Sequence, residues 1–256
     1  MLFSHLALTL PRNIEHKMNL IVDIGNSTAK AAVFRDGEMV LRKRLNANLE
    51  DGIAMIVEEF DIDACAYSSV GRPQPDLADA IQHMVPVALH VTGMTPTPLV
   101  CDYLTPETLG ADRLAAAVGA AHCCPGRDLL IVDAGTCITY DYVSAEGHYL
   151  GGNISLGMGM RLRALNEQTA RLPLVAAEGD APLIGRNTHE AIRTGVIRGM
   201  DYEIKSYIRD MKQQHADARM FLTGGNGYRF AQEYEVERND ALVEIGLNCI
   251  LEYQRR

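Results

Sequence analysis

Two stretches of the chain combine a continuous apolar run with the same polar ending. The first, NLIVDIGNST, spans residues 19–28, and the second, DLLIVDAGTC, spans residues 128–137. Consecutive apolar positions are typical of a strand that is buried on both faces, and a glycine after the aspartate allows the backbone to turn. Aligned in register, the two stretches place Asp23 opposite Asp133. The hydrophobic pattern therefore predicts the same buried strand and turn in each half of the chain.

The segments after the two turns are also alike. TAKAAVF reads as a strand, Asp36-Gly37 is a strong hairpin signal, and EMVLRKR reads as the next strand. In the second half, TCITYDYV is followed by a turn at Glu146-Gly147 and then by HYLGG. The duplicated unit is therefore larger than a motif, and it consists of three strands joined by two turns.

Between and after these units, helical and strand-like patterns alternate. Helical spacing is present in LEDGIAMIVEEF, PDLADAIQHMV, GADRLAAAVGAAHCC, GMRLRALNEQTARL and DALVEIGLNCILEY, and Asn187 is expected to cap a further long helix. IDACAYSSV and ARMFL read as strands, and TGGNG at residues 223–227 reads as a turn. This order predicts an α/β chain of two similar halves, residues 18–124 and 125–256. Residues 1–17 are expected to form a poorly ordered extension, with Met18 as the hypothetical biological start.

Composition and charge narrow the function. The chain has 256 residues, of which 47% are hydrophobic and 22% charged, as in ordinary globular proteins. Its net charge of −9 argues against nucleic acid or an anionic membrane as the main partner. No apolar run reaches the roughly 18–20 residues that span a bilayer. The six cysteines form no C-x-x-C pair, which favours buried free thiols in a reducing compartment over a zinc site or disulfides.

Each Asp-x-Gly turn carries groups that suit phosphate oxygens and cations. The first turn offers Asn26, Ser27, Thr28 and Lys30 after Asp23, and the second offers Gly135 and Thr136 after Asp133. Two such turns facing one cleft would hold a polyphosphate and its cations between them. A single copy is compatible with a plain turn after a strand, but the duplication with matched hairpins favours the ligand site. The common nucleotide motifs G-x-x-x-x-G-K-[ST] and G-x-G-x-x-G are absent from the sequence.

Two further motifs allow two interpretations each. GADR at residues 110–113 places an acid and a guanidinium at the start of an Ala-rich helix. It is either a capping aspartate with a surface arginine or part of a substrate site. TGGNG is either a tight turn or a loop against the adenosine of a nucleotide.

Taken in order, DIGNSTAK, GADR, DAGTCITYD, GGNI, GRNT and TGGNG resemble the type III pantothenate kinases, from Met18 to the last helix. That family belongs to the acetate-and-sugar-kinase/actin superfamily. The resemblance implies two duplicated actin-like (ribonuclease H-like) halves with the nucleotide in the cleft between them. It implies ATP-dependent phosphorylation of pantothenate to 4'-phosphopantothenate, the first step of coenzyme A biosynthesis. It also implies Mg²⁺, a monovalent cation (K⁺ or NH₄⁺) and a cytoplasmic homodimer, with no nucleic-acid or membrane partner.

The resemblance assigns roles residue by residue. By this resemblance, Asp112 matches the position of the family's general base, and Asp133 matches the position of its monovalent-cation ligand. The substrate-binding positions are Tyr103, Gly110, Ala111, Asp112, Arg113 and Thr188. The ATP-binding positions are Asp23, Ile24, Gly25, Asn26, Ser27, Thr28, Ala29, Lys30 and Thr136. One departure is Leu156, which stands where the family usually has the proline of Gly-Gly-x-Ile-x-Pro-Gly.

Two other functions remain open on the sequence alone. One is a kinase of the same superfamily that acts on another small hydroxylated acid or sugar. The other is a nucleotide-binding regulatory protein of the same fold without turnover. Because Asp112 and both Asp-x-Gly turns are present, the sequence favours a catalytically active kinase.

Overall fold

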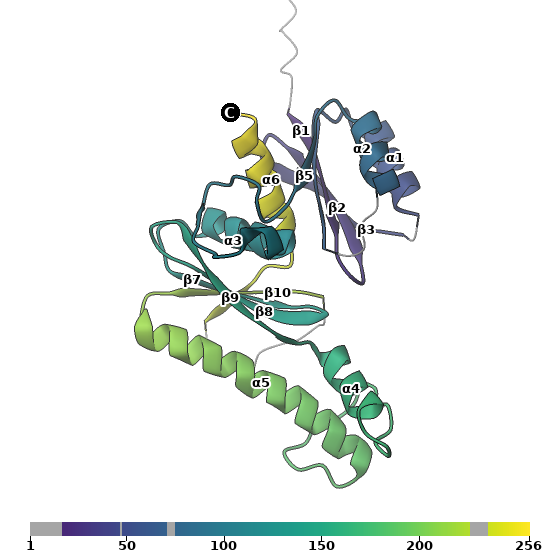
Figure 1. Cartoon of the computed structure of the whole chain (residues 1–256), viewed down its shortest axis with the longest axis vertical. Helices are drawn as coiled ribbons and strands as arrows, with labels where there is room; N and C mark the ends of the chain where they lie inside the picture. The colour runs from purple at the N-terminus through teal and green to yellow at the C-terminus, as the bar shows by residue number, and fades with distance from the viewer. Residues whose placement is uncertain (1–16, 47, 71–74, 226–234) are drawn as a thin grey trace, which may run out of the picture.

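The computed structural model describes residues 17–46, 48–70, 75–225 and 235–256, whose strands form two sheets (Figure 1). The first sheet has the strand order β3-β2-β1-β4-β5, and the second has the order β11-β10-β7-β8-β9-β6. The strands of the first sheet are β1 (Met18–Ile24), β2 (Ala29–Arg35), β3 (Glu38–Leu45), β4 (Ala64–Ser69) and β5 (Ala88–Val91). Those of the second are β6 (Val100–Cys101), β7 (Leu129–Ala134), β8 (Cys137–Val143), β9 (His148–Leu156), β10 (Arg219–Thr223) and β11 (Val236–Arg238).

Helices cover both sheets in layers. Figure 1 shows α3 and α6 between the two sheets, α1 and α2 on the outer side of the first, and α4 and α5 beyond the second. The helices are α1 (Leu49–Glu59), α2 (Pro75–Met84), α3 (Ala111–Cys123), α4 (Met158–Glu167), α5 (Thr188–Gln214) and α6 (Leu242–Gln254), with a 3-10 turn, η1 (Pro106–Thr108). Each helix predicted from the sequence is present. The short strands β5, β6 and β11 were not expected.

The duplicated hairpins are confirmed. Strands β1, β2 and β3 are antiparallel neighbours, and so are β7, β8 and β9. Asp36 and Gly37 both have positive φ, 51° and 87°, which is the geometry that a tight hairpin turn requires. Each first strand also has a parallel neighbour on its other side, β4 beside β1 and β10 beside β7. The two halves therefore repeat a topology as well as a motif.

Strand alternation directs the matching carboxylates of the two repeats, Asp23 and Asp133, to the inside. In β1, Leu20 and Val22 pack in the outer core with α1 and α2, whereas Ile21 packs in the inner core with α3 and α6. In β7, Leu130 and Val132 lie in the core below α5, and Ile131 lies in the inner core. Side chains two residues apart share a face of a strand. Asp23 and Asp133 therefore follow Ile21 and Ile131 on the inner faces of the two sheets.

The two inner helices pack at glycine contacts. A Cβ atom on Gly246 of α6 would lie 1.7 Å from the carbonyl oxygen of Ala115, and one on Gly119 of α3 would lie 2.1 Å from that of Leu242. Both obstacles are backbone atoms, which cannot move without separating the helices. The close approach of α3 and α6 therefore depends on these two glycines.

We expect Gly246→Ala to lower the free energy of unfolding by roughly 3 kcal/mol, because the added methyl group overpacks a helix contact made by backbone. Urea denaturation measures this change. Gly195→Ala in α5 is the matched control, since no atom lies within 4 Å of the Cβ position there. That control is expected to stabilise the protein by up to about 1 kcal/mol through helix propensity. Equal behaviour of the two variants would contradict the proposed contact.

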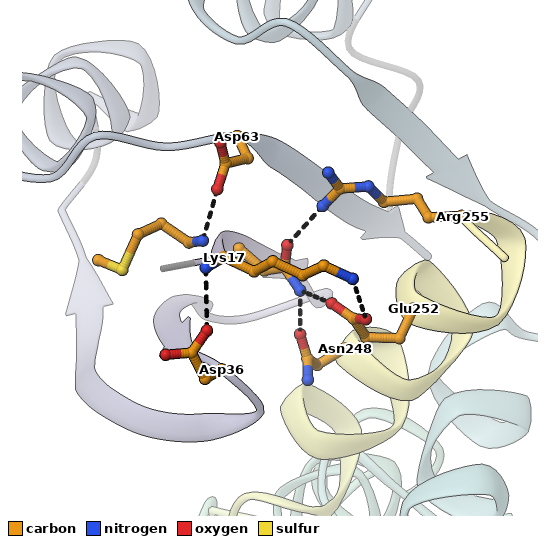
Figure 2. Close-up of polar contacts among 8 residues, drawn as sticks. Lys17, Asp36, Asp63, Asn248, Glu252 and Arg255 are labelled. Carbon is orange, nitrogen blue, oxygen red and sulfur yellow. Dashed lines mark hydrogen bonds and ion pairs between the residues drawn. The ribbon is translucent and has the colours of Figure 1, made fainter. Parts of the chain in front are cut away.

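The last helix is tied to the start of β1, at the end of the strand far from Asp23. Figure 2 shows Asn248, Glu252 and Arg255 turned toward this strand. The buried Asn19 amide donates to Asn248 Oδ1 (2.8 Å) and to Glu252 Oε1 (2.6 Å), and Arg255 Nη1 donates to Asn19 Oδ1 (3.0 Å). The end of the chain thus packs on the first sheet. The division at residues 124 and 125 stays a prediction, because α3 of the first half contacts β7 and β8 of the second, and α6 of the second half contacts β1, β2 and β4 of the first.

The cysteines match the sequence prediction only in part. All six cysteines are free thiols, as predicted, but only Cys65 is buried, while Cys101 and Cys123 are exposed. The expected general burial was wrong because Cys101 lies on a two-residue edge strand and Cys123 at the end of α3. No helix in the described residues is both long and apolar enough to cross a bilayer. Apart from Lys17, the predicted N-terminal extension lies outside the described residues.

Candidate active site

The two Asp-x-Gly turns meet. In the first, the Gly25 amide donates to the Thr28 carbonyl (2.9 Å), and in the second the Gly135 amide donates to the Cys137 carbonyl (2.9 Å). Ser27 Oγ of the first turn lies 3.0 Å from Thr136 Oγ1 of the second. Asn26, Ser27 and Thr28 are exposed, whereas Ile24 and Ala29 are buried and support the turn. The arrangement leaves hydroxyl and amide groups of both halves at one place on the surface.

Asp23 is a buried carboxylate at the base of the first turn. Its Oδ1 atom accepts a hydrogen bond from Ser68 Oγ at 3.0 Å, and its side chain is 8% exposed. The pKa of Asp23 is raised to about 6, chiefly by burial and next by the nearby carboxylate of Glu244, while the charge of Lys30 opposes the shift. Lys30 is the register partner of Asp23 on β2. The sequence predicted a partner for Asp23, and the structure provides Lys30 and Ser68.

Asp133 has a similar environment with more negative charge around it. The pKa of Asp133 is raised to about 7, chiefly by burial and also by the negative charges of Asp112, Asp23 and Asp141, while the charge of Lys30 again opposes the shift. Asp133 therefore lies among carboxylates with little positive charge from the chain. A bound cation would keep it ionised at neutral pH.

Gly224, in the predicted TGGNG turn, closes over Asp133. It has a positive φ of 103°, and a Cβ atom there would lie 2.6 Å from Asp133 Oδ1 and from the Ala134 carbonyl oxygen. Only glycine allows the chain after β10 to pass this close to the carboxylate. Asn226 and Gly227, the last residues of the motif, lie outside the described residues.

Asp112 lies in the first turn of α3, and the helix start places its carboxylate. Gly110 is the N-cap residue, and a Cβ atom there would lie 2.5 Å from Asp112 Oδ1. The same oxygen accepts a hydrogen bond from the Arg113 amide at 2.8 Å. Burial raises the pKa of Asp112, and its charge in turn raises the pKa values of Asp23 and Asp133. Three carboxylates from both halves are therefore close neighbours.

Arg113 is buried, so the interpretation of GADR as a capping aspartate with a surface arginine is wrong. The guanidinium is 7% exposed, and its Nε and Nη2 atoms lie 2.9 and 2.7 Å from Asp141 Oδ1. Asp141 also accepts from the Tyr149 hydroxyl (2.7 Å) and from Thr139 Oγ1 (3.1 Å). The chain itself thus neutralises Arg113. The sequence reasoning missed Asp141.

Tyr103 joins this group from the loop before α3. The Arg113 Cζ atom lies 5.8 Å from the centroid of the Tyr103 ring. The centroids of the Tyr103 and Tyr149 rings are 6.2 Å apart. A Cβ atom on Gly151 would come within 3.2 Å of the Tyr103 ring. The structure therefore brings Tyr103 together with the predicted substrate positions from Gly110 to Arg113.

Thr188 is in a different place. It begins α5 and lines a pocket of about 960 Å³ with residues of α4 and of the loop before α5. None of the residues that surround Asp112 lines this pocket. Asn187 caps α5 as predicted, since its Oδ1 atom accepts from the Glu190 amide at 3.0 Å. Within one chain, Thr188 thus stands apart from the other predicted substrate positions.

A second pocket, of about 310 Å³, is lined by Lys30 of β2, shortly after the first turn. Lys30, Arg42, Lys43, Arg44, Gly224, Gly225, Arg238 and Asp240 line it. The sequence reasoning identified only Lys30 and the two glycines. The alternation in LRKRL, which places Arg42 and Arg44 on one face of a strand, was the available signal.

In the described part of the chain, no cluster of three or more His, Cys, Asp or Glu side chains is arranged to hold a metal ion. A cation near Asp133 would therefore need further ligands, such as backbone carbonyl or phosphate oxygens. This donor set suits a hard cation that acts together with a phosphate-bearing substrate.

Comparison with known proteins gives one consistent family. A family model described as type III pantothenate kinase matches residues 19–210. The type III pantothenate kinase of Phocaeicola vulgatus is 42% identical over 238 residues, which cover 92% of this chain and 98% of that protein. That of Bacteroides fragilis (strain ATCC 25285) is 44% identical over 239 residues, with the same coverage of 92% and 98%.

Solved structures support the fold. A conserved putative Baf family transcriptional activator from Campylobacter jejuni has a TM-score of 0.60 at 23% identity, covering 92% of this chain and 98% of that one. The activator of the 2-hydroxyisocaproyl-CoA dehydratase from Clostridium difficile has a TM-score of 0.53 at 13% identity, covering 94% and 96%. At these identities the likeness shows the fold alone. Together with the two sheets, it confirms the expected two-lobed, actin-like α/β class.

Proposed function

Because the chain belongs to the type III pantothenate kinase family, we propose that it transfers the γ-phosphoryl group of ATP to the hydroxyl group of pantothenate. The family makes the protein an enzyme, a phosphotransferase of coenzyme A biosynthesis. The observation that carries the proposal is the convergence of Asp23, Asp112 and Asp133 where the two turns meet. Phosphoryl transfer depends on positioning and charge neutralisation, and this place offers ligands for both.

Asp112 is the proposed general base. It accepts the proton of the pantothenate hydroxyl as the hydroxyl oxygen bonds to the γ-phosphorus and the bond from that phosphorus to the ADP oxygen breaks. The Arg113 amide holds Oδ1 of Asp112, which orients the carboxylate and leaves Oδ2 to receive the proton. Burial raises the pKa of Asp112, which strengthens the carboxylate as a base.

The ATP phosphates are proposed to bind the first turn, with Lys30 beside them and Thr136 opposite. When bound, Mg²⁺ and a monovalent cation (K⁺ or NH₄⁺) neutralise phosphate charge. The residues fit such cations, since three carboxylates lie close together and Lys30 is the cation that opposes them at both Asp23 and Asp133. Asp23 would face Mg²⁺ with the phosphates, and Asp133 would hold the monovalent cation.

We also propose a homodimer in which Thr188 of one copy completes the pantothenate site of the other. Two observations support it. Thr188 lines a pocket apart from Asp112. Leu183 and Ile184, shortly before it in the chain, are 70% and 73% exposed, which is unusual for large apolar side chains that have no partner surface. The proposed location is the cytoplasm.

The test is a direct assay. Incubation with ATP, Mg²⁺, K⁺ and pantothenate is expected to yield 4'-phosphopantothenate, detected by mass spectrometry, and replacing K⁺ by Na⁺ is expected to lower the rate. Turnover with another hydroxylated acceptor but not with pantothenate would favour the other-substrate kinase. ATP binding without any turnover would favour the regulatory protein.

A further inference from the structure

The first sheet carries a row of charged side chains across its strands. Asp23 of β1 is paired with Lys30 of β2, and Lys30 is paired with Arg44 of β3. Directly paired residues point to the same face of a sheet. Arg42, two residues before Arg44, lies on that face as well and pairs with Ala32. Three cations of β2 and β3 therefore share the inner face with Asp23.

The corresponding row of the second sheet is different. Asp133 of β7 is paired with Thr139 of β8, and Thr139 is paired with Ile154 of β9. The duplicated topology thus places Thr139 where the first half has Lys30, and Ile154 where it has Arg44. Since both halves share the backbone plan and only the first half has these cations, the fold itself does not require them, and we look for their role in binding.

These cations line one pocket that both halves build. Lys30, Arg42 and Arg44 face Gly224 and Gly225, which follow β10 in the second half, in a pocket of about 310 Å³. Arg44 Nη2 lies 3.8 Å from the position that a Cβ atom of Gly225 would take. In a chain of net charge −9, such a concentration of positive charge indicates an anionic ligand.

The Arg42 guanidinium is held by a buried carboxylate of α6. Its Nε atom donates to Glu244 Oε1 at 2.9 Å, and its Nη2 atom donates to the Asp240 carbonyl oxygen. Glu244 is completely buried, and its Oε2 atom has no hydrogen-bond partner in the described residues. Because the Arg42 side chain is 32% exposed, the ion pair contributes little net stability, and we infer that the buried carboxylate serves to fix the guanidinium. Asp141, another buried acid, holds the Arg113 guanidinium in the same way.

We propose that Arg42 and Arg44 bind the phosphate chain of the donor nucleotide, with Glu244 as a positioning residue for Arg42. The inference rests on the proposed kinase function and deepens it. Several cations suit the several charges of a triphosphate better than the single carboxylate of pantothenate. The pocket also adjoins Lys30 and the glycine turn, and none of Tyr103, Asp112 and Arg113 lines it.

Steady-state kinetics of Arg44→Ala test the proposal. We expect the KM for ATP to rise about tenfold, as for the loss of one charge-assisted phosphate contact, with the KM for pantothenate and kcat changed by less than about twofold. Arg44→Lys should recover part of the loss. Arg35→Ala is the control, since it removes the same charge from the exposed far end of β2. An unchanged KM for ATP, or a rise in the KM for pantothenate instead, would overturn the proposal.

A binding measurement separates this inference from the kinase function. Calorimetry with inorganic tripolyphosphate and no pantothenate should show binding to the wild type that is about tenfold weaker in Arg44→Ala and weakens with added salt. Equal binding by both proteins would refute the phosphate site even if pantothenate is phosphorylated. Binding that differs as expected in a protein without turnover would refute only the kinase function.

Glu244→Gln tests the positioning role. The amide keeps the shape and an acceptor for Arg42 but removes the charge that fixes the guanidinium. We expect a higher KM for ATP, with kcat and the KM for pantothenate retained. A lower melting temperature with an unchanged KM for ATP would show that Glu244 is merely structural and would overturn this part of the proposal.

Discussion

Replacing Asp112 with asparagine is expected to lower kcat at least about a hundredfold, because general-base catalysis typically contributes a factor of 10²–10⁴. The amide can still accept the hydrogen bond that the Arg113 backbone donates to Oδ1, so the start of α3 should keep its geometry. It cannot take the hydroxyl proton. Binding of ATP, measured by calorimetry, should be no weaker than in the wild type, since one of the carboxylates around the phosphate site is lost.

Asp102→Asn is the matched control. Asp102 lies in the same region, is exposed, and pairs with His148 at 2.9 Å instead of facing the cleft. The substitution Asp102→Asn also turns a carboxylate into an amide, but at an exposed position. We therefore expect kcat to stay within about twofold of the wild type. If Asp112→Asn turns over as fast as this control, Asp112 is not the base.

Much of the fold follows from local sequence signals. The hairpin at Asp36-Gly37 was predictable because two residues with positive φ suit a tight turn, and glycine adopts this conformation at no steric cost. The buried strands β1 and β7 were predictable because their apolar runs are too short for helices. The edge strand β6 was not, because two residues carry no recognisable pattern and its partner β9 lies almost fifty residues later in the chain.

The residues of the site were predictable where they stand in a local sequence motif. Asp23, Asp112 and Asp133 stand in recognisable motifs, and the repeat itself indicated that the two turns belong to one ligand site. Asp141 and Glu244 were not found. Their sequence neighbours read as an ordinary strand and an ordinary helix start, and their burial depends on Arg113 and Arg42, which are distant in the chain.

The missed residues share one physical role. The carboxylates of Asp23 and Asp133 have more negative than positive charge near them. By contrast, Arg113 and Arg42 are each paired with a buried carboxylate. The chain thus fixes these two arginines and leaves the negative charge of the two aspartates only partly compensated. Such a cleft is unfavourable when empty and is stabilised by cations and by the ligands that bring them. Stability should therefore be limited by the same acids that serve catalysis.

Asp23→Asn is expected to stabilise the ligand-free protein and to abolish most of its activity. In the folded protein the pKa of Asp23 is raised to about 6 from the ordinary aspartate value of 3.8, so the folded state binds a proton more tightly than the unfolded state. Folding stability therefore falls as pH rises from about 4 through about 6. About two pKa units correspond to about 3 kcal/mol, which is lost at pH 8 and recovered by removing the charge.

Thermal unfolding without nucleotide, measured from pH 4.5 to 8, checks this result. Asp23→Asn should unfold several degrees above the wild type at pH 8, and the difference should shrink toward pH 4.5, where the wild-type carboxyl is protonated. Asp61→Asn, an exposed acid of the same half, should show no such difference. At pH 8 the kinase rate of Asp23→Asn should fall at least about a hundredfold, because the amide cannot neutralise a magnesium ion at the phosphates. A variant that is less stable at pH 8 would show that the Asp23 charge is compensated in the folded protein, contrary to the burial and neighbouring charges described above.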